Sequence, residues 1–350
     1  MAASIQRIDT RNLRPGMKLA NALMSEAHSL LVAEKTILTQ LIIERIRHSD
    51  MRYVDILVDM ESAALAARQP QPPKLVENQL KMVRSVKASF DRMRLTRALP
   101  HEEFLTIANE ISTTMIDTPG VITALQMVKS VDNYTYTHSV NVGVLCGLIG
   151  KWTGHQNLQG LILAGLLHDV GKTQIPLEIL NKPSALTSPE MKVMRRHSEL
   201  GYELAMGNGS INEEAMSGIL FHHERIDGSG YPSGLRGVQV PQFSRVLAVA
   251  DIFDSMTSNR VYRSAVTPFA VLEEIYDEMF SALDPAVCFV FRQRIKELLV
   301  GSKVLLSDGR SARIIFIDGN DHFKPVLQDE MGQSFQLEGN TPDIARFVSD

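Results

Sequence analysis

The stretch LLHDVGK, residues Leu166–Lys172, decides how this chain is interpreted. His168 and Asp169 are adjacent in it, at the end of an apolar run and just before a glycine. A carboxylate buried at a helix end is costly unless another group compensates its charge. A metal ion would compensate it, although a charge interaction at the helix end also fits a single His-Asp pair. The pair is therefore a candidate metal site that needs partners elsewhere in the chain.

Five residues of the same chemical type are expected on helical segments of their own, about one helical hairpin apart. They are His138, His197, His222, His223 and Asp251. Imidazole and carboxylate groups without cysteine favour Fe or Mn, with Zn also open, over a structural zinc centre. Seven ligands are too many for one ion, whereas an aspartate shared by two ions gives a centre that cleaves phosphate esters. Asp169 is the expected bridge.

The adjacent pair His222-His223 cannot share one face of a helix. We expect the two rings to converge near a helix end, because the loop sequence IDGSG follows soon after. A single histidine in a helix is more often an ordinary packed or exposed residue. We assign that ordinary role to His28, His48, His101, His155 and His322.

Four motifs in sequence order make the chain resemble the HD-GYP family, a branch of the HD-domain metal-dependent phosphohydrolases. The motifs are DNYTYTHSVNV at Asp132–Val142, LLHDVGK at Leu166–Lys172, HHERIDGSGYP at His222–Pro232 and ADIFDSMTSNRVYR at Ala250–Arg263. The characteristic activity of this family is hydrolysis of cyclic di-GMP, a bacterial second messenger.

The resemblance implies a role for each matching residue. The implied ligands of two divalent transition metals, Fe or Mn, are His138, His168, Asp169, His197, His222, His223 and Asp251. The implied substrate contacts are Lys172, Gly230, Tyr231, Arg260 and Arg263, with Lys172 at the scissile phosphate. Arg offers a phosphate a planar fork of donors, and Lys offers a point charge.

Asp254 is a third candidate catalytic residue beside Asp169 and Lys172. It lies three residues after Asp251, so both share one helix face. Its carboxylate could accept a proton or orient a water. An exposed carboxylate or a hydrogen-bonding partner of a ligand is an equally open reading.

The chain departs from the family pattern at four places, one of which is Leu283-Asp284-Pro285 where FDP is usual. RVYR at Arg260–Arg263 stands where RPYR is frequent, and losing that proline should alter local stiffness more than chemistry. Ser198 follows His197 where a proline is common. Tyr134 stands where some members carry a glutamate and bind a third metal, so two metals are expected. No core ligand is missing, which argues against a non-catalytic copy.

The expected activity is metal-dependent hydrolysis of cyclic di-GMP to pGpG by a hydroxide that two metals activate. Whether GMP follows is left open. One alternative is a phosphohydrolase of another cyclic dinucleotide. The other is a cyclic di-GMP sensor, or a module that docks a partner such as a GGDEF-domain cyclase, with little turnover.

The composition limits the class of protein. The net charge of -4 gives no reason to expect nucleic-acid binding. Cys146 and Cys288 lie in apolar helical contexts and are expected to be reduced core residues of a cytoplasmic protein, with a disulfide less favoured. The sequence contains no run of roughly 18 apolar residues, so no membrane span is predicted. Residues Met1–Met17 lack the apolar core of a signal peptide.

We expect a mainly α fold in which an HD-type helical core carries smaller parts at both ends. The parts are residues 1–66, a small regulatory α/β domain; 67–100, a proline-bearing linker and connecting helix; 101–300, the catalytic domain; and 301–350, a short β segment. In the first part, LTQLIIERIRHSD predicts an amphipathic helix and RYVDILVDM a strand. In the last, four alternating segments separated by DGR, DGN and other polar turns predict an antiparallel sheet.

The connecting helix is predicted from about Val76 to Ala98, with a basic, solvated face. Its apolar residues Val83, Val86, Phe90 and Met93 leave a homodimer contact open. Further along the chain, the helix carrying His197 has two candidate starts. One is an N-cap at Ser188 with Pro189 in the first turn, and the other is a capping box of Thr187 with Glu190.

Overall fold

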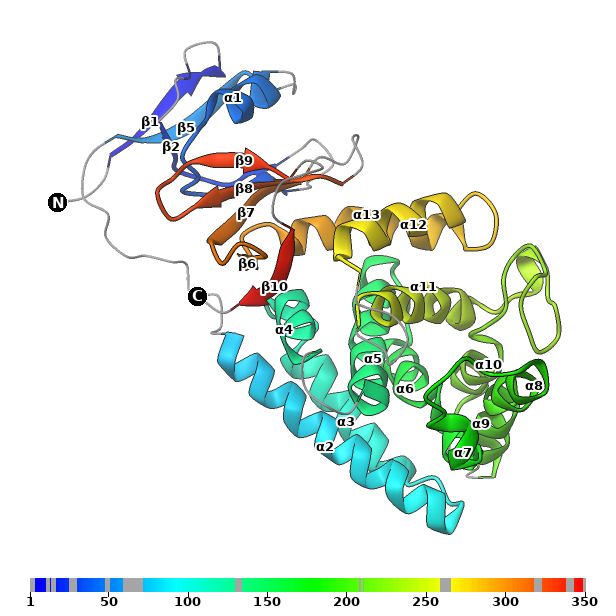
Figure 1. Ribbon diagram of the computed structural model, residues 1–350. Coiled ribbons are helices and arrows are strands. Elements are labelled where there is room, and N and C mark those ends of the chain that lie inside the picture. The colour runs from blue at the N-terminus through cyan, green and yellow to red at the C-terminus, as the bar shows by residue number, and fades with distance from the viewer. Residues whose placement is uncertain are drawn as a thin grey trace. The chain divides into compact units, whose positions relative to one another are not determined.

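A computed structural model (Figure 1) describes residues 4–10, 13, 17–24, 30–47, 51–58, 72–129, 134–207, 209, 211–258, 266–317, 323–337 and 343–348. These residues form two compact units. The first combines residues 1–71 with 293–350, and the second spans Pro72–Arg292. The prediction of a mainly α fold with small β-containing parts is confirmed, because the second unit is helical and the described strands belong to the first.

The first unit contains the predicted N-terminal α/β part. An antiparallel sheet has the order β1 (Ser4–Asp9), β5 (Tyr53–Val58) and β2 (Lys18–Leu19). A two-stranded sheet pairs β3 (Leu23–Met24) with β4 (Leu30–Val32), and α1 spans Gln40–Arg47. Ile42 and Ile46 of α1 are buried as predicted, whereas the side chain of Leu41 lies outside the described part.

The C-terminal segment forms the predicted antiparallel sheet. Its strands are β6 (Lys303–Leu306), β7 (Ser311–Ile317), β8 (Pro325–Asp329), β9 (Ser334–Gln336) and β10 (Ile344–Val348), in the order β10-β6-β7-β8-β9. The first four match the predicted alternating segments, and β10 was not predicted.

The two ends of the sequence share one hydrophobic core. Ile42 and Ile56 from the N-terminal segment belong to the same buried cluster as Ile315 and Val326 from the C-terminal sheet. Sequence patterns alone give no sign of this pairing and predict two separate parts.

The second unit is a bundle of helices (Figure 1). They are α2 (Pro72–Thr96), α3 (His101–Thr114), α4 (Val121–Val128), α5 (Tyr134–Trp152), α6 (Leu158–Leu167), η2 (Val170–Gln174), α7 (Leu177–Leu180), α8 (Ser188–Arg195), α9 (His197–Met206), α10 (Glu213–Phe221), η3 (Gly237–Gln239), α11 (Gln242–Met256), α12 (Pro268–Glu278) and α13 (Pro285–Leu299), which runs on into the first unit. Helix α5 is buried on all sides from Thr137 to Gly150, and its part from Val142 to Gly150 is apolar all round, as expected for a central helix.

Glycines let α5 and α6 pack closely. A Cβ atom at Gly165 would lie 2.8 Å from the Cα atom of Gly143, so neither helix could approach as closely with a larger residue there. The close approach matters for the site, because His138 lies near the start of α5 and His168 directly follows α6.

The apolar face of α2 is used inside the chain. Val83, Val86, Phe90 and Met93 are each 5% exposed or less, and α2 contacts α4 and α5. The idea that these residues form a dimer contact is therefore wrong, because they already pack in the core of the second unit.

The competing capping box at α8 is the one that forms. Thr187 is the N-cap residue, and its N–H and hydroxyl donate to Oε2 of Glu190 at 2.7 Å and 2.9 Å. The single helix predicted to carry His197 is two helices, because α8 ends at Arg195 and His197 begins α9.

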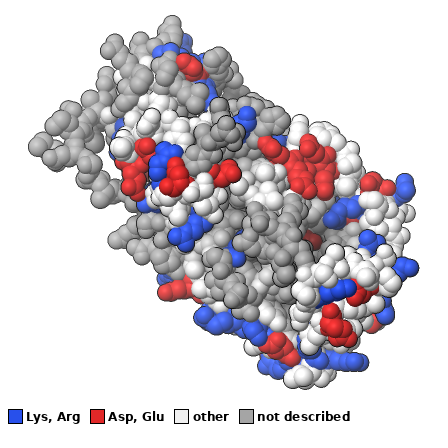
Figure 2. Space-filling model, in the orientation of Figure 1, with Lys and Arg blue, Asp and Glu red and all other residues white. Residues whose placement is uncertain are grey.

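Cys146 and Cys288 are buried and unpaired, as predicted. Among the described residues, none of the helices is both long and apolar enough to cross a membrane. Figure 2 shows Lys and Arg along α2 and Asp and Glu gathered over α12. Lys81 of α2 and Glu274 of α12 are among the exposed residues. The described part of this face therefore carries both signs of charge.

Candidate metal centre

The seven predicted ligand residues meet where helix ends of the second unit converge. They are His138 in α5, His168 and Asp169 directly after α6, His197 at the start of α9, His222 and His223 directly after α10, and Asp251 in α11. Six of the seven are buried, and His223 is partly exposed. The expected convergence of the adjacent histidines at a helix end is observed.

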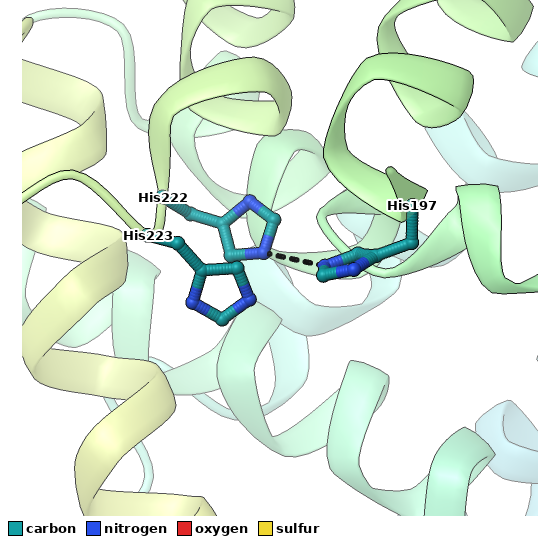
Figure 3. A group of neighbouring side chains, drawn as sticks. All are labelled: His197, His222 and His223. Atoms are coloured by element: carbon teal, nitrogen blue, oxygen red, sulfur yellow. Dashed lines mark hydrogen bonds between the residues drawn. The ribbon is translucent and has the colours of Figure 1, made fainter. Parts of the chain in front are cut away.

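The ligand atoms form two groups. One contains His197, His222 and His223, and the other contains His138, His168 and Asp251, with the atoms of each group within 4.8 Å of one another. Figure 3 shows the three rings of the first group turned toward one another from α9 and from the end of α10.

Asp169 reaches both groups through different oxygen atoms. Its Oδ1 lies 3.3 Å from Nε2 of His197, in the first group. Its Oδ2 lies 3.4 Å from Nε2 of His168 and 3.7 Å from Nε2 of His138, in the second group. A carboxylate with one oxygen directed to each group has the geometry of a bridge.

Backbone carbonyls fix which nitrogen each histidine presents. The distance from Nδ1 to the carbonyl oxygen three residues earlier is 2.7 Å in His168, 2.8 Å in His197 and 2.8 Å in His222. A carbonyl oxygen only accepts, so Nδ1 carries the proton and Nε2 of the neutral ring is a free acceptor.

The Nε2 atoms of four histidines face one another in pairs. The two Nε2 atoms are 3.2 Å apart between His138 and His168, and 3.2 Å apart between His197 and His222. Burial, aided by neighbouring cations, lowers the pKa of His197 to about 4 and that of His223 to about 3, so both rings are neutral at pH 7. The opposed lone pairs of His197 and His222 repel at this distance unless a cation lies beside them. The donor set fits divalent metal ions.

His138 is held between two carboxylates. Its Nε2 is 3.1 Å from Oδ1 of Asp251, and its Nδ1 is 2.8 Å from Oδ2 of Asp254. Burial lowers the pKa of His138, but the two carboxylates outweigh it and raise the pKa to about 9. The pocket around this ring therefore favours a positive charge, which a divalent ion at Nε2 would supply.

Lys172 lies on η2, three residues after Asp169. Its Nζ atom is 2.5 Å from Oδ2 of Asp169, and its side chain is 25% exposed. Burial raises the pKa of Asp169, but Lys172 and His168 hold it well below its usual value. The ammonium group is thus fixed beside the two groups and remains accessible to an anion from solvent.

A buried glutamate that the sequence analysis missed holds the loop after the paired histidines. Glu224 is 2% exposed, and its carboxylate accepts from the N–H groups of Ser233, Gly234 and Leu235 at 2.6–3.0 Å. Its position directly after His223 could have drawn attention to it. This carboxylate fixes the loop that carries Gly230 and Tyr231.

Gly230 and Tyr231 lie at the edge of the site. A Cβ atom at Gly230 would lie 2.5 Å from the Cα atom of Glu224, so only glycine fits there. The ring of Tyr231 stacks on that of His223, with centroids 4.6 Å apart. Burial and nearby carboxylates raise the pKa of Tyr231, so its hydroxyl remains a donor. The guanidinium of Arg195, which the sequence analysis did not single out, lies 4.9 Å from the Tyr231 ring centroid.

Asp254 is buried and contacts His138, so the reading of an exposed carboxylate is wrong. Its other partners are Lys129 and Asn141, at 2.9 Å and 2.8 Å. Arg260 and Arg263 lie outside the described residues. Of the histidines given ordinary roles, His101 and His155 belong to neither ligand group, and His28, His48 and His322 fall outside the described residues.

The sequence of the second unit matches a known family. Residues 124–287 match the HD domain. This segment belongs to the HD-domain family. The match confirms the resemblance drawn from the four motifs, and the HD domain coincides with the described helices that carry the two ligand groups.

Curated relatives of the HD domain include several phosphodiesterases. The chain is 32% identical to a cyclic di-GMP phosphodiesterase of Pseudomonas aeruginosa over 74% of this chain and 62% of that protein. It is 42% identical to the cyclic di-GMP phosphodiesterase response regulator RpfG of Xanthomonas campestris over 40% of this chain and 38% of that protein. It is 40% identical to the 3′3′-cGAMP-specific phosphodiesterase 1 of Vibrio cholerae, over 41% of this chain and 34% of that protein. The chain thus spans less than two thirds of each of these relatives.

A solved structure resembles the fold over most of the chain. It is a HDG"Y"P protein from Bdellovibrio bacteriovorus, with a TM-score of 0.51, 16% identity, and coverage of 84% of this chain and 100% of that one. At this identity the likeness concerns the fold alone.

Proposed function

We propose that the chain is a metal-dependent phosphodiesterase that hydrolyses cyclic di-GMP to linear pGpG. The observation that carries this proposal is the placement of the Asp169 oxygens, one toward each group of histidines. Two centres bridged by a carboxylate suit phosphate-ester cleavage. The relatives named as cyclic di-GMP phosphodiesterases support the choice of substrate.

The chain's own groups have distinct tasks in this reaction. Bound divalent ions would supply Lewis acidity and lower the pKa of a coordinated water. Lys172 offsets negative charge that develops on the scissile phosphate, while water attacks phosphorus in line with the leaving 3′ oxygen. Tyr231 and the backbone at Gly230 line one side of the dinucleotide, and Arg260 and Arg263 are assigned to its phosphates and guanines.

We propose two divalent ions per chain, Fe or Mn. Imidazole and carboxylate donors with no thiolate support these metals. Protein purified anaerobically without chelator is expected to hold about two ions per chain by elemental analysis. Removing them with a chelator should abolish hydrolysis, and adding Mn²⁺ should restore it. A single zinc ion per chain, or full activity after chelation, would contradict this proposal.

A close cyclic dinucleotide is the second candidate substrate. The 3′3′-cGAMP-specific relative, at 40% identity, favours it. Hydrolysis of cyclic di-GMP, 3′3′-cGAMP and linear pGpG by the Mn²⁺-loaded protein, followed by chromatography, decides between them and shows whether GMP is formed. Tight cyclic di-GMP binding with no product from any of the three would instead support a sensor.

We place this activity in the cytoplasm, where two buried, unpaired cysteines stay reduced. A GGDEF-domain protein and a second copy of the chain remain predicted partners. The α2 residues that suggested a second copy are buried within the chain, so any dimer must use another surface.

A further inference from the structure

One buried cation beside the metal centre has no role in the reaction described above. Lys129 follows the last residue of α4, and its side chain is only 6% exposed. Its Nζ atom is 2.9 Å from Oδ1 of Asp254 and also donates to the hydroxyl of Thr257. A lysine is rarely buried to this extent without a carboxylate partner, and here that partner contacts a ligand residue.

Each oxygen of Asp254 has assigned partners. Oδ2 accepts from Nδ1 of His138 at 2.8 Å. Oδ1 accepts from Lys129 and from the side-chain amide of Asn141 at 2.8 Å. The carbonyl of Asn141 accepts in turn from Nε2 of Gln79 on α2, at 2.5 Å. Side chains from α5 and from the end of α4 therefore converge on one carboxylate of α11, and α2 supports it through Asn141.

The ammonium group is the only full positive charge among these Asp254 partners that does not belong to a candidate ligand. A buried carboxylate that loses its cation is strongly destabilised, and it must move, gain a proton or recruit another cation. Each response would change the acceptor that fixes the ring of His138. Of the contacts that the structure describes for Lys129, with Asp254, Thr257 and the ring of Phe253, the one with Asp254 leads on to a candidate ligand, His138.

We propose that Lys129 is a positioning residue of the metal centre: its ion pair with Asp254 fixes the acceptor that orients His138, and so sets the metal affinity of the group His138, His168 and Asp251. Within the described part of the chain, the group His197, His222 and His223 makes no contact with this ion pair, and it keeps its ion. The inference deepens the proposed function and rests on it, because it requires that the histidines bind metal.

The test uses the full chain and measures metal, not turnover alone. Lys129→Met removes the charge and keeps most of the volume. Mn²⁺ titration with elemental analysis should show one of the two ions bound about 10–100-fold more weakly, the usual effect of losing a partner of a ligand. The matched control is Lys151→Met, because Lys151 pairs with Asp117 on the surface of the same unit. It should leave both ions in place.

A double-variant comparison separates positioning from general damage. Since Lys129 acts through Asp254, Lys129→Met combined with Asp254→Asn should bind Mn²⁺ no more weakly than Asp254→Asn alone. Losses that simply add would overturn the inference. If Lys129→Met does not fold, Lys129→Gln, which keeps a donor without the charge, takes its place in the same comparison.

Failure of this inference differs from failure of the proposed function. If the wild-type chain binds no metal, both the role of Lys129 and the proposed function are wrong. A wild-type chain that binds two ions, beside a folded Lys129→Met variant that binds both equally well, ends only the role of Lys129.

Discussion

At the scale of single residues, the position of a histidine relative to a helix end decides which nitrogen it presents. His168 and His222 directly follow helices, and His197 begins the helix after α8. The last carbonyls of a helix have no partner within it. In each case the carbonyl three residues earlier accepts the Nδ1 proton and leaves Nε2 free for the centre. Placing a histidine at a helix end thus sets both its location and its tautomer.

Replacing Asp169 tests the bridge. Asp169→Ala should lower kcat/KM for cyclic di-GMP by at least about 10²–10³-fold, the usual loss when a main electrostatic group is removed. It should also reduce the metal content of both groups, since one oxygen faces each. Asp117→Ala, at an exposed carboxylate of the same unit, is the control and should change neither value. An Asp169→Ala variant that keeps two ions would show that the carboxylate is not a bridge.

Tyr231 should act on substrate and not on metal. Tyr231→Phe keeps the ring stacked on His223 and removes one hydroxyl donor. We expect an unchanged metal content and a several-fold higher KM, worth about 0.5–1.5 kcal/mol for one neutral hydrogen bond. Steady-state kinetics with parallel elemental analysis checks this. Loss of metal in Tyr231→Phe would mean that the hydroxyl supports the centre itself.

The sequence made most of the centre predictable at this scale, because residue type and order already carry the chemistry of His168 and Asp169. It left Asp254 undecided between three readings. Lys129 could not be predicted, because its partner lies 125 residues away on another helix and only the fold brings them together. A partner of a ligand is defined by contact and leaves no local pattern.

At the scale of elements, close packing of η2 against α9 fixes the positions of Lys172 and His197 in the site. η2 carries Lys172, and α9 begins with His197. A Cβ atom at Gly171 would lie 1.9 Å from the backbone oxygen of His197, so the two elements touch through a residue without a side chain. The sequence pattern predicts one helix through His197. The short break at Arg196 was not visible in the periodicity, because one residue between two helices hardly alters it.

Gly171→Ala should therefore separate η2 from α9. The added methyl group must displace backbone, so we expect a loss of about 1–3 kcal/mol in the free energy of unfolding, as for overpacked cores. Metal affinity should fall at the same time, because Asp169 and His197 move apart. Gly207→Ala is the matched control, since the nearest atom to its added Cβ is 3.5 Å away. Denaturant unfolding and Mn²⁺ titration of both variants measure the effect. If both variants have the same free energy of unfolding and the same Mn²⁺ affinity, the contact between η2 and α9 accommodates a methyl group without loss of stability.

At the scale of the whole molecule, the two ends of the sequence belong to the same compact unit. The N-terminal strands and helix α1 share a buried cluster with the C-terminal sheet. Local patterns correctly predicted α1, β5 and four of the C-terminal strands. They could not show that Ile56 and Val326 share one core, because such pairing depends on contacts across most of the chain. A prediction that divides the sequence into consecutive segments therefore cannot find the first unit, which combines residues 1–71 with 293–350.

Deleting only the first 71 residues should consequently damage the C-terminal sheet. Ile315 and Val326 would lose Ile42 and Ile56 as neighbours, at about 1.5–3 kcal/mol for each large apolar side chain exposed. A variant that begins at Pro72 and keeps the tail should melt in two steps or aggregate. A variant spanning Pro72–Leu299, which lacks both segments and keeps α13 whole, should stay folded and keep its metals. Calorimetry and elemental analysis of both variants decide this. If the first variant melts like the full chain, the shared core adds no stability. If the second is folded and metal-bound but inactive, the first unit supplies or controls part of the active site.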